Sequence, residues 1–461
     1  MERFNDTICA PATAGGGAIS MVRVSGPHAL DCVDRIFRGR MHLADARGYS
    51  LHYGTIQEQD DTLVDEVVVS VFRAPHSYTG ENAAEITCHG SQYIVSRILA
   101  LLIENGAKMA APGEFTQRAF IQGKMDLSQA EAVADLIAAQ TSAAHRIALK
   151  QLKGGFSDEL ATMREDLLQV ASLMELELDF SEEEVEFADR VQLRELVEEV
   201  LAHIDKLIES FRIGNAIKNG VPVAIVGNTN AGKSTLLNAL LGENRAIVSA
   251  IPGTTRDTVE ETFNLDGVTF RFIDTAGLRE SQDTIERIGI ERAYEKIAAA
   301  QIVLAVLDLT APLSEIQASA SAIQARVTPE QQFYCLLNKA DAVPAATVAA
   351  ARKAISPAPA YCISAREGTG MDELRQALAD SWRDLDTAAE TTLVTNIRHL
   401  EALQNAATAL RRVQDGLATT TPTDLIAQDL RECLYHLGSI VGQVSNNEIL
   451  TNIFGRFCIG K

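Results

Sequence analysis

The chain has 461 residues, of which 46% are hydrophobic, 22% charged and 5% aromatic. This composition excludes a disordered, a collagenous and a small disulfide-stapled protein, and the length predicts about three domains. The 62 acidic and 41 basic residues give a formal net charge of −21, which argues against non-specific binding to nucleic acid or to an anionic membrane. A local basic patch, or an RNA partner recruited with a second protein, stays possible.

The spacing of the cysteines and the hydropathy of the chain argue against several further classes of protein. The seven cysteines are Cys9, Cys32, Cys88, Cys335, Cys362, Cys433 and Cys458. Their odd number and the lack of any C-x-x-C spacing predict neither a disulfide framework nor a zinc ribbon. The first residues lack the basic and apolar regions of a signal peptide, and no apolar run approaches the ~18–20 residues of a membrane span. We therefore expect a cytoplasmic protein with no membrane partner.

The first 122 or so residues alternate short β-type runs with glycine and proline. Strands are predicted over 18–24, 63–72 and 84–88, where apolar and β-branched residues alternate or run together. A helix is predicted over 91–105. Strands and helices mixed in this way indicate an α+β domain at the N-terminus.

From residue 127 to about 211 the apolar period becomes helical. Leu193, Val197, Val200 and Ile204, for example, keep to the i, i+3/i+4 spacing of a buried helix face. The segment 213–220 contains two glycines and is expected to leave the helix as a linker.

Residues 221–382 alternate strand and helix. Buried strands are predicted over 221–226, 269–274, 302–307, 332–337 and 359–363. Intervening helices indicate a doubly wound parallel sheet. After Trp382 the chain is again helical, apart from a break at 419–423. The sequence therefore predicts a multidomain protein in which an α/β domain is inserted into an all-α domain made of two segments. The expected divisions are 1–122, 123–217, 218–382 and 383–461.

A phosphate-binding motif follows the first strand of the α/β segment. Residues 227–234 read G-N-T-N-A-G-K-S, directly before a helix that begins near Thr235. The glycines let the backbone curl, so that N–H groups and the helix N-terminus cradle phosphates. Lys233 is expected to reach the β- and γ-phosphates, and the Ser234 hydroxyl is expected to bind Mg²⁺. The alternative is a chance glycine turn, and the strand before and helix after argue against it.

Two further motifs follow later strands and concern the base. An N-K-A-D motif at 338–341 follows the strand over 332–337, and S-A-R at 364–366 follows the next strand. The Asp341 carboxylate can accept hydrogen bonds from N1–H and the exocyclic amine of guanine, whereas adenine has an acceptor at N1 and lacks that amine. A backbone N–H of the second motif is expected to face guanine O6. Either motif alone is weak, but together they favour GTP over ATP.

Two mobile loops are expected between these motifs. The D-T-A-G motif at 274–277 ends its strand with a carboxylate for the hydration shell of Mg²⁺ and a glycine N–H for the γ-phosphate. The loop P-G-T-T-R-D at 252–257 supplies Thr255 as the second Mg²⁺ ligand. Together they are typical of the order–disorder switch of a GTPase.

One position departs from the commonest GTPase mechanism. Leu278 stands where many GTPases place a water-orienting glutamine, and a leucine cannot polarise water. Glu280, Asp283 and Glu286 lie on the same segment. We interpret Glu280 and Asp283 as solvent-facing loop charges.

This GTPase cassette, together with the C-terminal F-C-I-G-K at 457–461, resembles the MnmE (TrmE) family. Further segments similar to that family are D-T-I at 6–8, V-R-V-S-G-P at 22–27, S-Y-T-G-E at 77–81, P-G-E-F-T-Q-R-A-F at 112–120 and G-K-M-D-L-S-Q-A-E-A at 123–132. The resemblance therefore covers the whole chain.

The resemblance implies a folate-binding N-terminal domain that forms a homodimer, a discontinuous helical domain and an inserted Ras-like GTPase domain. It implies that the protein works with an FAD-dependent partner of the MnmG (GidA) family, in a heterotetramer or larger assembly. The reaction would add an aminomethyl or carboxymethylaminomethyl group to carbon 5 of the wobble uridine of certain tRNAs. The one-carbon unit would come from a tetrahydrofolate derivative, 5,10-methylene or 5-formyl. GTP hydrolysis would depend on K⁺ and on pairing of GTPase domains across the dimer.

The resemblance also assigns roles at the nucleotide site. It implies that Asn230, Ser249 and Ile251 ligate K⁺, with Thr254 nearby, and that Glu286 orients the attacking water. Arg256, Asp257 and Arg279 would support them. The residues assigned to GTP by the motifs and the resemblance are Asn230, Ala231, Gly232, Lys233, Ser234, Thr235, Ser249, Ala250, Ile251, Pro252, Gly253, Thr254, Thr255, Asp274, Thr275, Ala276, Gly277, Asn338, Lys339, Asp341, Ser364, Ala365 and Arg366.

For tetrahydrofolate the resemblance points to Arg23, Glu81, Lys124 and Lys461. The basic groups suit an anionic glutamate tail, and Glu81 suits the donor edge of a pteridine. Cys458 would lie close to this site, and a catalytic role for its thiol is a hypothesis. The loop over 12–18 departs from the family pattern, because it lacks a basic residue among its glycines and is shorter.

A second hypothesis is a non-catalytic, RNA-binding regulatory GTPase, such as a ribosome-assembly switch. Such a switch requires neither the folate-type N-terminal segments nor the Cys-Ile-Gly-Lys tail. Those two features therefore favour the tRNA-modifying enzyme.

Overall fold

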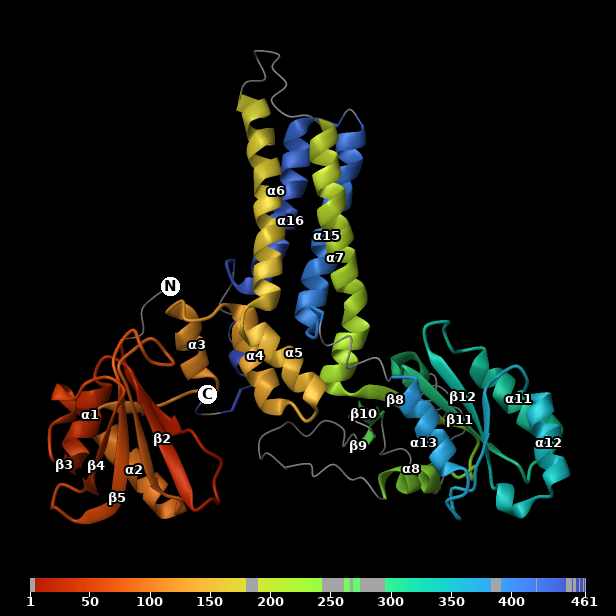
Figure 1. Cartoon of the computed structure of the whole chain (residues 1–461), viewed down its shortest axis with the longest axis horizontal. Coiled ribbons are helices and arrows are strands. Elements are labelled where there is room, and N and C mark those ends of the chain that lie inside the picture. The colour runs from red at the N-terminus through yellow and green to blue at the C-terminus, as the bar shows by residue number, and fades with distance from the viewer. Residues whose placement is uncertain are drawn as a thin grey trace. The chain divides into compact units, whose positions relative to one another are not determined.

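The computed structural model of the chain describes residues 5–179, 190–242, 261–265, 268–273, 295–382, 391–419 and 421–444, with 450, 453–455, 457–458 and 460 in the tail. These residues form two compact units (Figure 1). Unit 1 comprises Met1–Ala138, Leu149–Leu201 and Gln404–Lys461, and unit 2 comprises Ala139–Ala148 and Ala202–Leu403.

The N-terminal part of unit 1 is built on a seven-stranded mixed sheet of order β3-β4-β5-β6-β2-β1-β7. Its strands are β1 (Thr7–Pro11), β2 (Ile19–Ser25), β3 (Phe37–Gly39), β4 (Ser50–Gln57), β5 (Leu63–Phe72), β6 (Ala83–His89) and β7 (Ala107–Met109). Neighbouring strands are antiparallel except β1 and β7, which are parallel. The expected α+β architecture is confirmed.

Two helices, α1 (Ala29–Ile36) and α2 (Gln92–Glu104), cover one face of this sheet. Alternate residues of β5 such as Val67 and Val69 enter the shared core, because successive strand residues point to opposite faces. The same alternation leaves Leu51 and Tyr53 of β4 exposed on the other face. The sheet therefore has one packed face and one open face.

The helical part continues with α3 (Glu114–Ile121), α4 (Leu127–Ala138), α5 (Ser142–Leu152), α6 (Gly155–Asp179) and α7 (Arg190–Asn219), and returns with α15 (Ile397–Ala418) and α16 (Thr423–Val441). Helix α6 packs along α16, so two segments far apart in the sequence form one bundle (Figure 1). This confirms an all-α domain in two segments.

The linker expected over 213–220 is wrong, because α7 continues to Asn219. Gly214 lies inside the helix, where a Cβ would come within 2.2 Å of the carbonyl oxygen of Val394. The glycine therefore permits a close backbone contact and does not end the helix.

Unit 2 is built on a six-stranded sheet of order β13-β12-β11-β8-β10-β9. Its strands are β8 (Val221–Val226), β9 (Glu261–Leu265), β10 (Val268–Phe272), β11 (Ile302–Asp308), β12 (Gln332–Asn338) and β13 (Ala360–Cys362). All neighbours are parallel except the edge pair β9–β10. The five predicted strands are confirmed, and β9 was not predicted.

Helices lie on both faces of this sheet. Apolar residues of α8 (Lys233–Leu241) and α13 (Met371–Asp380) share a core with one face. Those of α11 (Leu313–Gln324) and α12 (Ala345–Ala354) share a second core with the other face. This is the doubly wound arrangement, which brings the carboxyl ends of the parallel strands to one edge.

Within the described residues, every helix is too short or too polar to cross a membrane.

Candidate functional site

The phosphate loop joins the end of β8 to the start of α8 through unusual backbone conformations. Gly227, Asn230 and Gly232 have φ values of +150°, +62° and +100°. A Cβ at Gly227 would lie 2.2 Å from the carbonyl oxygen of Val306 in β11. Only glycine fits there, and the loop curls so that the N-terminal amides of α8 are available to an anion.

Lys233, the first residue of α8, folds over this loop. Its Nζ donates to the carbonyl oxygens of Gly227 at 2.8 Å and Asn228 at 2.7 Å. Burial lowers the pKa of its ammonium, and the nearby charge of Lys296 lowers it further. The ammonium has three N–H donors, so these two bonds leave one for a phosphate oxygen.

Asn338, at the end of β12, joins three sequence motifs through one buried side chain. Its Nδ2 donates to the carbonyl oxygen of Ala231 at 2.8 Å, and its Oδ1 accepts from the backbone N–H of Ala365 at 3.0 Å. A Cβ at Gly232 would come within 2.2 Å of Asn338 Nδ2. Asn338 therefore fixes the positions of the phosphate loop, the N-K-x-D turn and the S-A-R loop relative to one another.

The turn after Asn338 presents a lysine and a carboxylate. Lys339 has a φ of +63°, and its Nζ donates to Asp308 Oδ2 at 2.6 Å, while Thr310 donates to the other oxygen of Asp308. Burial raises the pKa of Asp308, but the bonds from Lys339 and Thr310 outweigh burial and lower it overall. Asp341 lies in the short helix η3 (Ala340–Ala342), and its side chain is exposed.

The other described residues that were predicted to bind the nucleotide lie at the carboxyl edge of the sheet, as expected. Ser234 and Thr235 lie exposed in the first turn of α8, Ser364 is buried and Arg366 is exposed. Several predicted residues lie outside the described part of the chain. They are Ser249, Ala250, Ile251, Pro252, Gly253, Thr254, Thr255, Arg256, Asp257, Asp274, Thr275, Ala276, Gly277, Leu278, Arg279, Glu280, Asp283, Glu286 and Lys461.

Among the residues predicted for folate, Arg23 lies on the open face of the N-terminal sheet between two aromatic rings. Its guanidinium carbon is 5.3 Å from the ring centroid of Tyr78 and 5.7 Å from that of Phe115. Its Nε and Nη2 both lie 2.9 Å from Glu85 Oε1 on the neighbouring strand. Arg23 is thus held in a half-buried position by Glu85 and the two rings.

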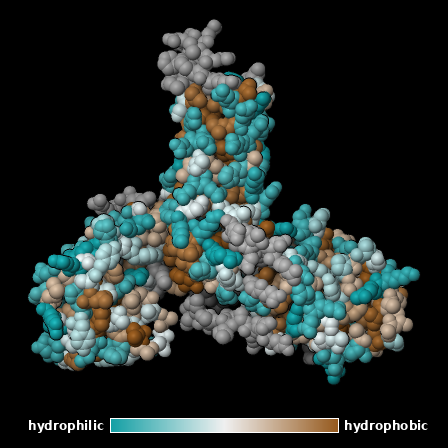
Figure 2. Space-filling view, viewed as in Figure 1, coloured by the Kyte–Doolittle hydropathy of each residue, from teal (hydrophilic) through white to brown (hydrophobic). Residues whose placement is uncertain are grey.

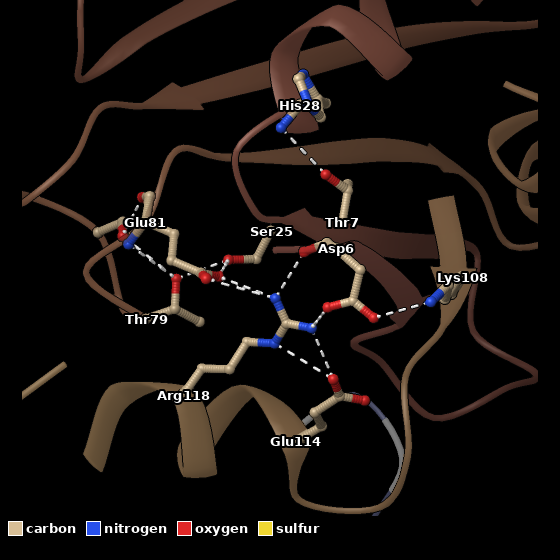
Figure 3. A network of polar contacts seen from close by, with 10 residues as sticks. Asp6, Thr7, Ser25, His28, Thr79, Glu81, Lys108, Glu114 and Arg118 are labelled. Carbon is tan, nitrogen blue, oxygen red and sulfur yellow. Dashed lines mark hydrogen bonds and ion pairs between the residues drawn. The ribbon is translucent and has the colours of Figure 1, made fainter. Parts of the chain in front are cut away.

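Glu81 belongs to a buried charge network centred on Arg118 of α3 (Figure 3). Arg118 has no exposed side-chain area, and its Nη2 donates to Asp6 Oδ1 and to Glu114 Oε1, each at 2.7 Å. Its Nη1 lies 3.4 Å from Glu81 Oε1, while the Ser25 hydroxyl donates to Glu81 Oε2 at 2.8 Å. One buried arginine therefore orients three carboxylates.

The network leaves Glu81 with unused acceptor capacity. A carboxylate can accept about four hydrogen bonds. The Glu81 carboxylate has one short bond, from Ser25, and long contacts with Arg118. The site is therefore suited to a ligand that presents N–H donors to Glu81.

In the same network, burial raises the pKa of Asp6, but the bonds from Arg118 and Lys108 outweigh burial and lower this pKa overall.

Lys124 and the C-terminal tail reach the same domain. Lys124 Nζ donates to the carbonyl oxygen of Pro75 at 3.1 Å, and the lysine stem lies beside Gly80. The Gly113 N–H donates to the carbonyl oxygen of the exposed Cys458 at 3.5 Å, and Arg23 Nη1 donates to that of Gly460 at 3.4 Å. Arg23 and the tail are thus brought together.

Sequence reasoning missed two of these residues, Arg118 and Asp308. Arg118 lies within a segment that supported the resemblance, but its partners Asp6 and Glu81 are 112 and 37 residues away in the chain. Asp308 directly follows the strand predicted over 302–307, and a carboxylate at that strand end is a signal that could have marked it.

Asn338 ties the strand, glycine loop and helix to an N-K-x-D turn at the carboxyl edge of a doubly wound sheet. This arrangement defines a P-loop GTPase. A family model described as the MnmE helical domain matches residues 127–458, and one described as the N-terminus of the GTP-binding protein TrmE matches 7–124. The chain belongs to the MnmE (TrmE) family.

Relatives support this assignment over the full length. The tRNA modification GTPase MnmE of Bacteroides thetaiotaomicron is 51% identical over 465 residues, which cover 99% of each chain. The protein of that name from Parabacteroides distasonis is 51% identical over 460 residues, covering 99% of this chain and 100% of its own. That from Cytophaga hutchinsonii is 48% identical over 463 residues, covering 100% and 99%.

Proposed function

We propose that this protein is a K⁺-dependent GTPase that acts in the cytoplasm on tRNA. With an FAD-dependent partner it adds an aminomethyl or carboxymethylaminomethyl group to carbon 5 of the wobble uridine, using a one-carbon unit of tetrahydrofolate. The observation that carries the proposal is the 51% identity to a tRNA modification GTPase over 99% of both chains.

At the nucleotide site, the α8 amides and Lys233 bind the phosphates, and Asp341 accepts two hydrogen bonds from guanine. Asn230 lies exposed in the loop, so its amide oxygen is open to K⁺, and Ser234, exposed in the first turn of α8, would ligate Mg²⁺ through its hydroxyl. Hard cations prefer such oxygen ligands, and when bound they neutralise charge that develops between the β- and γ-phosphates. Glu286 orients the water in this proposal.

In the N-terminal domain, Glu81 accepts hydrogen bonds from the donor edge of the pteridine, and Arg118 keeps that carboxylate in place. Arg23 and Lys124, with Lys461, bind the anionic glutamate tail. Loss of 5-formyltetrahydrofolate binding in Glu81→Gln, measured by calorimetry, with normal GTP turnover tests this assignment. Unchanged folate affinity would contradict it.

Cys458 is proposed to act near the one-carbon unit. Burial raises the thiol pKa of Cys9 and Cys335 to about 11 and that of Cys433 to about 12, whereas Cys458 is exposed. Limited alkylation at pH 8 is therefore expected to modify Cys458 well before these three. Wild-type levels of tRNA modification in Cys458→Ser would rule out a chemical role.

The open face of the N-terminal sheet supports the homodimer. Ile19, Leu51 and Tyr53 are 65%, 71% and 65% exposed on this face, which is unusual for a sheet of a solitary domain. A second copy of the same face would cover them with C2 symmetry. Leu51→Asp should shift the mass measured by light scattering from dimer to monomer, and an unchanged mass would contradict this arrangement.

The experiment that tests the whole proposal is complementation of a strain that lacks the gene. The wild-type chain should restore the modified wobble nucleoside, measured by mass spectrometry of tRNA digests, and Glu286→Ala should not. The purified chain should hydrolyse GTP faster in KCl than in NaCl. Normal tRNA modification in the deletion strain would favour a regulatory switch instead.

A further inference from the structure

An exposed arginine cluster lies at the β3 edge of the N-terminal sheet. Arg35 lies in the last turn of α1, Arg38 lies in β3, Arg40 follows that strand, and Arg47 follows the short helix η1 (Leu43–Asp45). Residues 35–47 contain one acidic residue, in a chain whose net charge is −21. This arginine surface is therefore a local exception to the charge of the molecule.

Two of the four arginines, Arg35 and Arg38, donate hydrogen bonds to backbone carbonyl oxygens. Arg35 Nη1 donates to the carbonyl oxygen of Asn105 at 3.4 Å, and Arg38 Nη1 donates to those of Arg35 and Phe37 at 3.0 and 3.1 Å. In the part of the chain that the structure describes, none of the four pairs with a carboxylate. Each guanidinium keeps donors for an anion from outside.

The backbone that carries these arginines is held in place. Leu43 and Ala46 are buried in the domain core. The Leu43 N–H donates to Asp34 Oδ1 at 2.6 Å, and Arg73 Nη2 donates to the carbonyl oxygens of Leu43 at 3.3 Å and Ala46 at 3.0 Å. A ligand would therefore order only the arginine side chains, and the entropy lost on binding is correspondingly small.

An exposed aromatic ring accompanies the positive charge. Tyr49 is 73% exposed and touches Phe72 edge-on, with ring centroids 6.0 Å apart. Arginines beside an exposed tyrosine are typical of surfaces that bind RNA, where phosphates meet the cations and unpaired bases stack on rings.

We propose that the arginine surface, defined as Arg35, Arg38, Arg40 and Arg47, binds the phosphate backbone of tRNA. The inference rests on the proposed function, which supplies tRNA as the RNA. In the sheet order, β3 lies four strand spacings, or about 19 Å, from β2, which carries Arg23 of the proposed folate site. The margin of the domain on the β3 side is largely hydrophilic (Figure 2). The surface therefore lies close enough to hold an RNA whose base reaches that site.

The test compares three variants of the full chain with wild type, using a fluorescently labelled, unmodified tRNA that carries a wobble uridine. In the first variant, all four arginines become glutamine. Each lost phosphate contact lowers the slope of log affinity against log salt by about 0.7–0.9, so we expect the slope to fall by about 3 and the affinity at 0.1 M salt to fall about 10- to 100-fold. GTP turnover without tRNA should not change.

The second variant, with four lysines in place of the arginines, keeps the charge and should retain affinity within a few-fold. The third is a matched control in which four exposed arginines elsewhere, Arg194, Arg326, Arg412 and Arg431, become glutamine. It loses the same charge and should bind nearly as wild type does.

Wild-type affinity and salt slope in the first variant would overturn the inference while leaving the proposed function intact. An equal loss in the lysine variant would overturn it as well, because a structural defect would then explain both. Loss of binding to the FAD-dependent partner with tRNA binding retained would assign the surface to an acidic protein instead. Failure of the wild-type chain to bind tRNA at any salt would contradict the proposed function itself.

Discussion

The nucleotide site and the N-terminal charge network solve the same problem, the placement of polar groups, in different ways. In the nucleotide site, the neutral side chain of Asn338 joins three loops through two hydrogen bonds to backbone groups. The N-terminal network uses one buried cation, Arg118, which holds the carboxylates of Asp6, Glu81 and Glu114. The hydrogen bonds of Asn338 bury no net charge, whereas the buried ion pairs of the N-terminal network are stable only while every partner is present.

The largest effect is expected at Arg118. Arg118→Met leaves three carboxylates around an apolar side chain, and breaking a buried ion pair in this way costs about 3–5 kcal/mol. Hydrogen exchange of the amides of β1 and β6 should accelerate strongly, while the amides of β8 and β11 stay protected. Arg97→Met, which removes the half-buried partner of Glu58 in the same domain, is the control and should leave exchange of the β1 and β6 amides nearly unchanged.

A protected β1 in Arg118→Met would show that the carboxylates do not depend on the arginine. The contrast between the two sites would then be wrong.

The next effect is expected at Asn338. Asn338→Ala leaves the Ala231 carbonyl and the Ala365 N–H without their partner, at about 1–3 kcal/mol for each buried group. GTP affinity, measured by fluorescence of a labelled nucleotide, should fall about 100-fold. Asn219→Ala removes a hydrogen bond between two exposed asparagine side chains and should not change affinity. Similar affinity in both variants would remove Asn338 from the nucleotide site.

A smaller effect is expected at Gly232. Gly232→Ala adds a Cβ at a positive φ and 2.2 Å from Asn338 Nδ2, so it should weaken GTP binding about 10-fold. Gly368→Ala is the matched control, because its φ is +78° but no atom lies within 4 Å of the added Cβ. That variant should lose about 1 kcal/mol of stability and keep its affinity. Equal affinities in the two variants would contradict the contact.

The smallest effect concerns pH. Because the pKa of Asp6 is lowered in the folded state, its ionised form stabilises the N-terminal domain above the unfolded pKa. That stability is lost as pH falls through the lower, folded pKa. Thermal unfolding between pH 6 and pH 2.5 should therefore show a steeper loss for wild type than for Asp6→Asn. Parallel curves would indicate that Asp6 does not contribute.

The same contrast explains what the sequence could predict. The phosphate loop and the guanine motifs are short, and each follows a buried strand, so the doubly wound sheet and its functional edge were predictable from residues 221–226 and 332–337. The edge strand β9 was not, because its residues TFN offer no continuous apolar run. In the N-terminal sheet, β1 contains a proline and β4 a glycine, which obscured both strands.

Gly214 and Arg118 show a second reason why parts of the structure could not be predicted from the sequence. A glycine that admits a neighbouring backbone and a glycine that ends a helix look alike in one sequence, and only the contact with Val394 separates them. Likewise, nothing near Arg118 in the chain indicates that Asp6, 112 residues earlier, is its partner. Interactions of this kind depend on the completed fold.

The most direct test of the central claim, that loops held by Asn338 present Asp341 to guanine, is the base preference of Asp341→Asn. An amide at this position can donate to an oxygen at carbon 2, as in xanthine, where the carboxylate accepted from an amine. Wild type should hydrolyse GTP far faster than XTP at equal concentration, and Asp341→Asn should prefer XTP. Retained preference for GTP in the variant would contradict the account.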